Sequence, residues 1–128
     1  MRGNAGMQKR ILIINTGGTL SSVKGCNGLV PGMSSGDMLE ELRMVSRNLE
    51  LEAEDFCSLD SSNIGPEDWT GLAKLIAKRS YDYDGIVVIH GTDTLAYTSA
   101  MLSFMLQNIS IPVVVTGSQL SIANPVAD

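Results

Sequence analysis

The sequence predicts a doubly wound α/β domain, in which a mainly parallel sheet has helices on both faces. Short, almost continuous apolar runs alternate along the chain with longer segments of helical spacing. Most of these runs lack the polar alternation of a sheet that faces water, so their strands are expected to be buried on both sides. The run over residues 51–59 differs, because it alternates, with Leu51, Ala53, Asp55 and Cys57 on one side. The composition of 44% hydrophobic and 18% charged residues fits one compact globular domain.

Four strands are expected, and a polar cluster lies at the carboxyl end of each. They cover the runs RILIIN (10–15), LEAEDFCSL (51–59), DGIVVIHG (84–91) and IPVVVTGS (111–118). Between the first two lies a glycine- and serine-rich stretch, residues 17–36, which is long for a loop in a compact domain. Long loops of this kind often bind ligands or cover a site, and we expect that here.

Three helices connect these strands. The first is expected over residues 34–49 and the third over 94–107. The second is predicted to begin at Pro66, because proline suits the first helical position. Its buried stripe is expected to be Trp69, Leu72, Ala73 and Ile76. The third helix is apolar around most of its circumference, so we expect it to be buried on several sides.

Charge and cysteine content exclude several classes of function. A net charge of −5 lacks the basic footprint of a protein that binds nucleic acid or anionic membranes. Cys26 and Cys57 form no CxxC pair and lie far in sequence from His90, so no metal site is expected. The apolar run Ile11–Ile14 is too short for a signal-peptide core or a membrane span, which favours a cytoplasmic protein.

Four polar clusters follow the predicted strands, where open α/β sheets bind ligands. They are residues 16–19 (TGGT), 60–63 (DSSN), 90–94 (HGTDT) and 116–119 (TGSQ). None contains Lys or Arg, and the chain has neither of the common glycine-rich phosphate motifs, which argues against a nucleotide. Hydroxyls and backbone N–H groups suit the carboxylate of a zwitterion, and Asp93 suits its ammonium group.

The residues alone leave the role of each cluster open. Thr16 is a nucleophile if a base reaches it through space; alternatively, Thr16 and Thr19 only cap a turn. Thr92 or Asp93 binds a ligand or only caps the third helix. For His90, a packed or hydrogen-bonded ring at a strand end is favoured over a catalytic base.

Taken together, the motifs TGGT, DSSN, PEDW, HGTDT and TGSQL resemble the N-terminal domain of bacterial and archaeal L-asparaginases, most closely the cytoplasmic type I branch. The resemblance covers residues 10–128 and implies hydrolysis of L-asparagine to L-aspartate and ammonia through an acyl-enzyme on threonine. It makes Thr16 the nucleophile, with Thr92 and Asp93 as a second catalytic and substrate-binding element. The substrate-binding segment that it implies is Asp60, Ser61 and Ser62.

The same resemblance assigns finer roles. Ser61 binds the substrate α-carboxylate, Asp93 binds the α-ammonium group, and backbone N–H groups near Thr92 form an oxyanion hole. It implies a small-molecule substrate, L-asparagine, with L-glutamine left open as an alternative. It also implies no metal or organic cofactor, no direct contact with nucleic acid or membrane, and a homodimer or homotetramer of the full-length form. Family members usually carry a loop tyrosine thirteen residues after the nucleophile, where this sequence has Leu29.

The expected domain organisation follows from the same resemblance. We expect residues 1–9 to be a disordered extension and residues 10–128 to be a truncated α/β domain. The lysine that partners the Thr-Asp pair and a smaller C-terminal domain would then lie beyond residue 128, and activity is expected of the full-length chain. Two alternatives stay open: the ammonia-releasing subunit of a tRNA-dependent amidotransferase, and a non-catalytic amino-acid-binding or assembly module.

Overall fold

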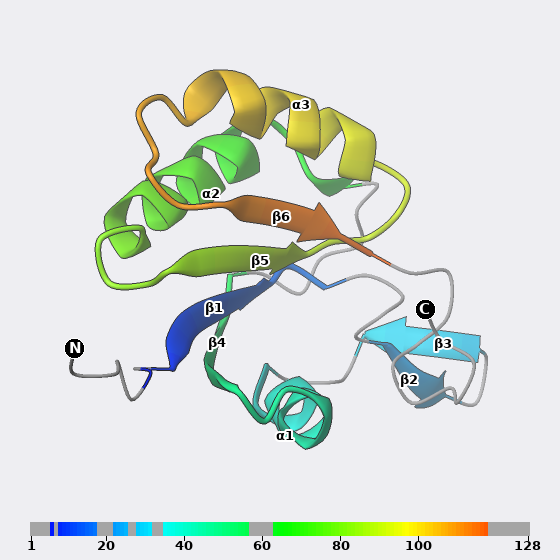
Figure 1. The fold of residues 1–128 in the computed structure, drawn as a ribbon. Helices are drawn as coiled ribbons and strands as arrows, with labels where there is room; N and C mark the ends of the chain where they lie inside the picture. The colour runs from blue at the N-terminus through cyan, green and yellow to red at the C-terminus, as the bar shows by residue number, and fades with distance from the viewer. Residues whose placement is uncertain are drawn as a thin grey trace.

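The computed structural model describes residues 6, 8–17, 22–25, 28–31, 35–56 and 63–117. Its centre is a four-stranded, wholly parallel sheet with helices on both faces, which confirms the predicted class (Figure 1). The strands are β1 (Lys9–Asn15), β4 (Leu49–Asp55), β5 (Gly85–Ile89) and β6 (Val113–Thr116). Helix α1 (Ser35–Val45) lies on one side, and α2 (Pro66–Arg79) and α3 (Leu95–Met105) lie on the other.

The spatial strand order is β4-β1-β5-β6. The chain therefore leaves β1 to form β4 on one side, and then crosses β1 to form β5 and β6 on the other. In open parallel sheets this reversal makes a crevice between the carboxyl ends of the two strands on either side of it. Here those strands are β1 and β5, which pair from Ile11 with Gly85 to Asn15 with Ile89.

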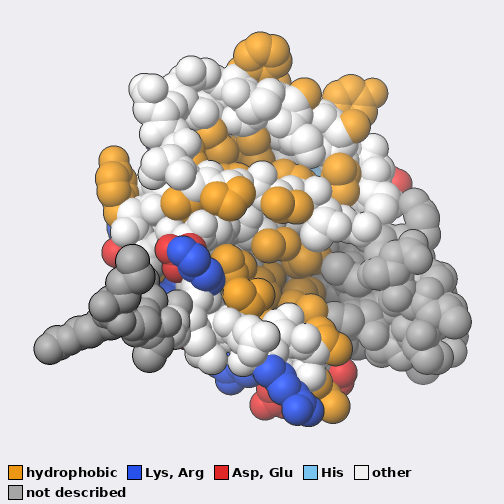
Figure 2. All heavy atoms as spheres, viewed as in Figure 1, with side chains coloured by type: hydrophobic (Ala, Val, Ile, Leu, Met, Phe, Trp, Pro, Cys, Tyr) orange, Lys and Arg blue, Asp and Glu red, His pale blue; other side chains and the backbone are white. Residues whose placement is uncertain are grey.

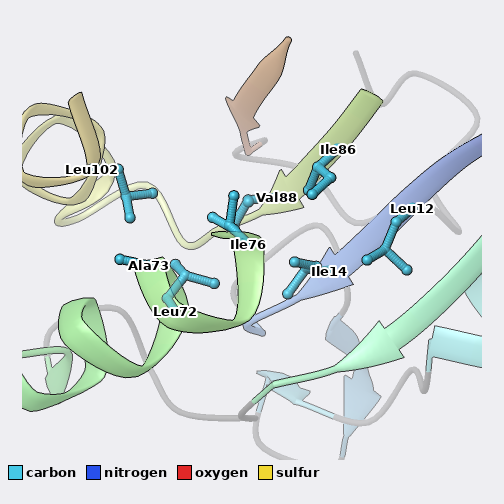
Figure 3. Packing of buried hydrophobic residues seen from close by; sticks show 8 residues of the cluster. All are labelled: Leu12, Ile14, Leu72, Ala73, Ile76, Ile86, Val88 and Leu102. Carbon is cyan, nitrogen blue, oxygen red and sulfur yellow. The ribbon is translucent and has the colours of Figure 1, made fainter. Parts of the chain in front are cut away.

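Successive side chains of each inner strand enter opposite layers of the core. On the α2 and α3 side, Leu12 and Ile14 of β1 pack with Ile76 and Leu102 (Figure 3). On the α1 side, Ile13 packs with residues that include Met38, Leu51 and Ile89. Burial on both faces is the physical reason that these strands read as continuous apolar runs.

Helix α2 forms as its sequence predicts. Pro66 is its first residue, and the Asp68 carboxylate accepts the N–H of the capping residue Gly65 at 3.0 Å. Leu72, Ala73 and Ile76 are buried, which confirms the predicted stripe, while Trp69 is half-buried. Within the described segments, no helix is long and apolar enough to cross a membrane.

Two expectations about local structure were wrong. The stretch 17–36 contains a hairpin, in which β2 (Ser22–Gly25) pairs antiparallel with β3 (Gly28–Pro31). Both strands have only four residues and carry glycine or proline at their ends, residues that are rare in strands, so the sequence suggested only a loop. Leu29 lies in β3 opposite Lys24. The first helix ends at Val45 because Leu49 already begins β4.

Helix α3 is much more exposed than its composition predicts. Only Thr98 and Leu102 are buried in it, whereas Tyr97 and Phe104 keep 66% and 76% of their surface exposed. The reason is its position beside β6, which is the edge strand of the described sheet. Figure 2 shows hydrophobic side chains in the hollow between α3 and β6, a groove of about 310 Å³ whose lining includes Leu102, Leu106 and Val113.

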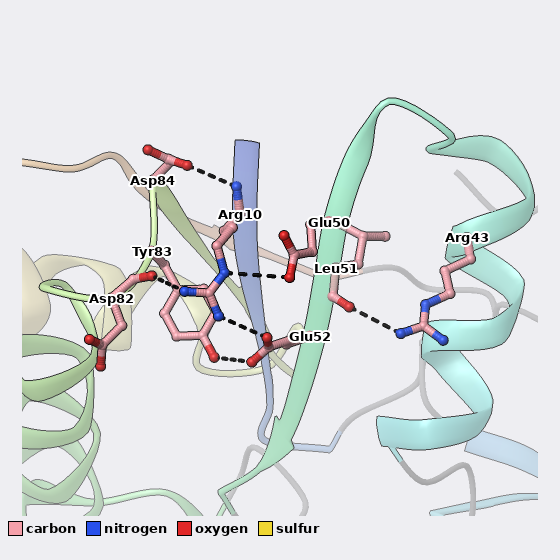
Figure 4. A network of polar contacts seen from close by, with 8 residues as sticks. All are labelled: Arg10, Arg43, Glu50, Leu51, Glu52, Asp82, Tyr83 and Asp84. Atoms are coloured by element: carbon pink, nitrogen blue, oxygen red, sulfur yellow. Dashed lines mark hydrogen bonds and ion pairs between the residues drawn. The ribbon is translucent and has the colours of Figure 1, made fainter. Parts of the chain in front are cut away.

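A network of polar side chains surrounds Arg10, near the amino-terminal end of β1 (Figure 4). The crevice lies at the opposite end of this strand. Arg10 makes an ion pair with Glu52 at 2.9 Å, and its guanidinium lies 5.0 Å from the centre of the Tyr83 ring. The Tyr83 hydroxyl donates a hydrogen bond to Glu52. The Tyr83 hydroxyl and then Arg10 hold the pKa of Glu52 below its ordinary value of 4.5.

Replacing Glu52 by Gln should make the protein less sensitive to acid. A carboxylate whose pKa is lower in the folded state stabilises the fold above its unfolded pKa, and this stability is lost as the pH falls through the folded value. The wild-type urea midpoint should therefore drop more than that of Glu52→Gln between about pH 6 and pH 3. The control is Glu67→Gln, in the exposed first turn of α2. If the urea midpoint fell equally in wild type and in Glu52→Gln over this pH range, the result would contradict this account.

Candidate active site

The parallel hydrogen bonding of the sheet continues one residue past the strand ends. Phe56 N–H donates to Asn15 O at 2.9 Å, Thr16 N–H to Ile89 O at 3.0 Å, and His90 N–H to Thr116 O at 2.8 Å. The residues that follow β4, β1 and β5 therefore lie in a row at one edge, next to the last residue of β6. This arrangement brings the beginnings of the segments after β1, β5 and β6 together, as the sequence predicts.

Thr16 occupies the crevice between β1 and β5. Its side-chain Oγ1 donates to Ile89 O at 2.7 Å, the same oxygen that accepts its backbone N–H. Only 1% of Thr16 is exposed. Since His90 follows Ile89 directly, this double hydrogen bond fixes Thr16 beside the start of the segment 90–94.

A second set of polar contacts shapes the turn after Thr16. Gly17 has φ of 97°, which favours glycine, and its N–H donates to Asn15 Oδ1 at 3.0 Å. The side-chain Nδ2 of Asn15 donates to Asp55 Oδ1 at 2.9 Å. Asp55 also accepts the Ser35 hydroxyl at 2.9 Å, where α1 begins.

Asn15 is therefore a site residue that the sequence analysis did not identify. It is 3% exposed and joins the turn at Gly17 to β4. The available signal was a polar side chain at the end of an otherwise apolar strand. Its partner Asp55 lies 40 residues later, and no local pattern shows that contact.

The histidine of the segment 90–94 is buried and hydrogen-bonded at both ring nitrogens. His90 is 0% exposed, its Nδ1 lies 2.7 Å from Gly91 O, and its Nε2 lies 2.8 Å from Thr98 Oγ1. The prediction of a packed, hydrogen-bonded ring is confirmed. Thr92 is half-buried and Asp93 is exposed. The N-cap of α3 is Thr94, so the alternative in which Thr92 or Asp93 caps that helix is wrong.

Several predicted site residues lie outside the described part of the chain. They are Asp60, Ser61, Ser62 and, in the first cluster, Thr19. Among the residues that the structure does describe, no group of three His, Cys, Asp or Glu side chains could hold a metal ion. The edge of the site next to β6 is formed by Gly117, where the His90 carbonyl leaves no room for a Cβ.

Substituting Gly117 by Ala should lower the free energy of unfolding by about 1–3 kcal/mol, because the protein must shift to fit the methyl group. The new Cβ would overlap His90 O, a backbone atom, and would lie 3.2 Å from Leu95 Cδ1. Urea unfolding measures the change.

Gly65→Ala is the matched control, because nothing lies within 4 Å of a Cβ added there. Its effect should stay within about 1 kcal/mol. Equal stability of Gly117→Ala and wild type would show that the packing against His90 is not tight.

Comparison with known proteins identifies close relatives. The family model described as "Asparaginase, N-terminal" matches residues 10–128. The L-asparaginase of Thermococcus kodakarensis is 45% identical over 121 residues, which are 93% of this chain. Its solved structure superposes with a TM-score of 0.81. A probable cytoplasmic L-asparaginase from Campylobacter jejuni is 30% identical, with a TM-score of 0.74 over 94% of this chain and 36% of that one.

A relative with a different name is also similar. One of the subunits of the glutamyl-tRNA(Gln) amidotransferase of Saccharolobus solfataricus is 38% identical over 127 residues, which are 96% of this chain. In both comparisons this chain matches only part of the relative. It spans 37% of the length of the Thermococcus protein and 28% of the Saccharolobus protein.

Proposed function

Because this chain belongs to the asparaginase family, we propose that it is the nucleophile-bearing part of an enzyme that hydrolyses L-asparagine to L-aspartate and ammonia. Relatives at 45% and 42% identity are named L-asparaginases, which supports an amidohydrolase. The single observation that carries the proposal is the position of Thr16. Both its backbone N–H and its side-chain hydroxyl are anchored to Ile89 O, in the crevice between β1 and β5.

In the proposed reaction, Thr16 Oγ1 attacks the carbon of the substrate side-chain amide. The C–N bond breaks, ammonia leaves with the hydroxyl proton, and an aspartyl ester remains on Thr16. Water then hydrolyses the ester and restores the hydroxyl. In the described structure the Thr16 hydroxyl donates to Ile89 O, a carbonyl that accepts a hydrogen bond but does not remove the proton. For the attack, the hydroxyl proton has to pass to a base.

The remaining roles follow the family resemblance. Asp93 holds the substrate α-ammonium group, and its exposed carboxylate is suited to this. Thr92 stands beside it, and backbone N–H groups near Thr92 stabilise the oxyanion. Asp60, Ser61 and Ser62 bind the rest of the amino acid, with Ser61 on the α-carboxylate. The lysine that partners Thr92 and Asp93 belongs to a longer chain, as does the C-terminal domain.

The same proposal includes the cellular location, the cofactor requirement and the oligomeric state of the enzyme. It acts in the cytoplasm on a small-molecule substrate without a metal or organic cofactor, as a homodimer or homotetramer. The similarity to a probable cytoplasmic L-asparaginase supports the location. A net charge of −5 supports a small substrate rather than direct contact with nucleic acid.

The second candidate is the ammonia-releasing subunit of a tRNA-dependent amidotransferase. Its support is the 38% identity to a protein with the name of such a subunit. Both candidates use the same threonine chemistry, so the amide donor and the need for tRNA separate them. An asparaginase releases ammonia from L-asparagine alone, whereas the amidotransferase component requires its partner and the charged tRNA.

The decisive assay uses an extended protein, in which this chain is followed by the part of the Thermococcus relative that lies beyond its match. We expect ammonia release from L-asparagine, and a fall of at least about a thousandfold in Thr16→Ala, because the ester can no longer form. Thr70→Ala is the control, since Thr70 is an exposed threonine on α2 and its loss should leave the rate unchanged.

Other results would overturn the proposal in distinct ways. Undiminished release by Thr16→Ala would exclude Thr16 as the nucleophile. Release that appears only with charged tRNA and partner subunits would favour the amidotransferase. Binding of L-aspartate in calorimetry without any ammonia from L-asparagine would favour the third alternative, an amino-acid-binding module.

A further inference from the structure

Three side chains, from α2, α3 and the segment that follows β5, are joined in one chain of hydrogen bonds. Trp69 of α2 donates its Nε1–H to Thr98 Oγ1 of α3 at 2.8 Å. Thr98 Oγ1 lies 2.8 Å from His90 Nε2, and His90 Nδ1 lies 2.7 Å from Gly91 O. His90 and Thr98 are both 0% exposed, so they depend on one another, rather than on bulk water, for their hydrogen bonds. We call Trp69, Thr98 and His90 the relay.

The partners at the two ends fix where each proton of the relay lies. The carbonyl of Gly91 can only accept, so His90 Nδ1 must carry a hydrogen and donate it. The Trp69 indole can only donate, so Thr98 Oγ1 accepts from it. Among the described contacts of Thr98, His90 Nε2 is the acceptor for the hydrogen of its hydroxyl. The relay therefore selects the neutral Nδ1–H tautomer of His90.

This tautomer also holds one backbone peptide. The Gly91–Thr92 peptide is planar, and the described part of the chain has no cis bond. Anchoring Gly91 O on the imidazole therefore turns the N–H of Thr92 to the opposite side, away from the ring. Thr92 begins the pair with Asp93 on which the proposed function depends.

From these contacts we propose that His90 is a positioning residue for the amide hydrolysis. Held in one tautomer by Thr98 and Trp69, it sets the orientation of the Gly91–Thr92 peptide and with it the start of the Thr92–Asp93 pair. The role in amide hydrolysis rests on the proposed function, whereas the orientation of the peptide does not. His90 is not a general base here, because both ring nitrogens are hydrogen-bonded and no part of the ring reaches the surface.

The composition of the chain makes the relay directly observable. His90 is its only histidine and Trp69 its only tryptophan. In the 128-residue protein labelled with ¹⁵N, two-bond proton–nitrogen NMR spectra would give a single imidazole pattern. We expect a protonated Nδ1 and an unprotonated Nε2 at neutral pH. The reverse tautomer, or an average of the two, would overturn the proposal.

Thr98→Val tests the link to the peptide, because valine keeps the shape and removes the hydroxyl. We expect loss of the single tautomer, a shift of the Trp69 indole signal, and a shift of the Thr92 amide signal. Thr98→Ser restores the hydroxyl and should restore all three signals. The matched control is Thr70→Val on α2, whose hydroxyl bonds only locally to Pro66 O at 2.9 Å. An unmoved Thr92 amide in Thr98→Val would overturn the positioning role.

The extended protein then tests the consequence for catalysis. Thr98→Val should lower kcat for L-asparagine by about tenfold, with KM changed less than about twofold, because orientation rather than binding is lost. Thr98→Ser and Thr70→Val should keep kcat near the wild-type value. A purely structural role would lower the amount of folded enzyme and leave kcat per folded molecule unchanged, and that result would overturn the proposal.

The two proposals fail in different ways. An extended wild-type protein that releases no ammonia would overturn the proposed function, and the tautomer and the Thr92 amide would still decide whether His90 positions the peptide. An active extended protein with the wrong tautomer, or with unchanged kcat in Thr98→Val, would overturn this inference alone.

Discussion

The candidate site depends on one backbone oxygen, that of Ile89. It accepts two hydrogen bonds from Thr16, one from the backbone N–H at 3.0 Å and one from Oγ1 at 2.7 Å. The first bond continues the parallel pairing of β1 with β5 beyond the last paired residues, Asn15 and Ile89. The second uses the same oxygen to fix a side chain. The register of the sheet, which the apolar core sets, thereby determines where a reactive hydroxyl lies.

Hydrogen bonds from buried polar side chains also fix the residues that follow the strands. Asn15 fixes Gly17 on one side of Thr16 and is itself held by Asp55 of the neighbouring strand. On the other side, His90 is held by Thr98 and anchors the peptide before Thr92. Within the described residues, no buried side-chain nitrogen or oxygen lacks a hydrogen-bond partner. Such complete pairing matters because an unpaired buried polar group costs about 1–3 kcal/mol.

Much of this arrangement could be predicted from the sequence. The continuous apolar runs indicated strands buried on both faces, and Pro66 with the stripe after it indicated α2. Since the carboxyl ends of parallel strands share one edge, the clusters that begin at Thr16, His90 and Thr116 were expected to meet there. The resemblance to asparaginases then gave these clusters chemical roles.

The rest depends on contacts between residues far apart in the chain. Trp69 reads as part of an apolar stripe, yet its indole N–H meets Thr98, 29 residues later. Thr98 reads as an ordinary helix residue, and Asn15 as the end of a strand. The exposure of α3 could not be foreseen either, because it follows from the position of that helix beside β6, the edge strand of the described sheet, and not from its composition.

The central claim, that the hydroxyl fixed on Ile89 O is the nucleophile, can be tested by covalent labelling of the extended protein. The reagent is an analogue of L-asparagine in which a diazomethyl ketone replaces the side-chain carboxamide. After proteolysis, tandem mass spectrometry locates the modified residue. The account predicts the label on Thr16, with protection by L-aspartate. A label on Thr92 or on another residue, with Thr16 unmodified, would contradict it.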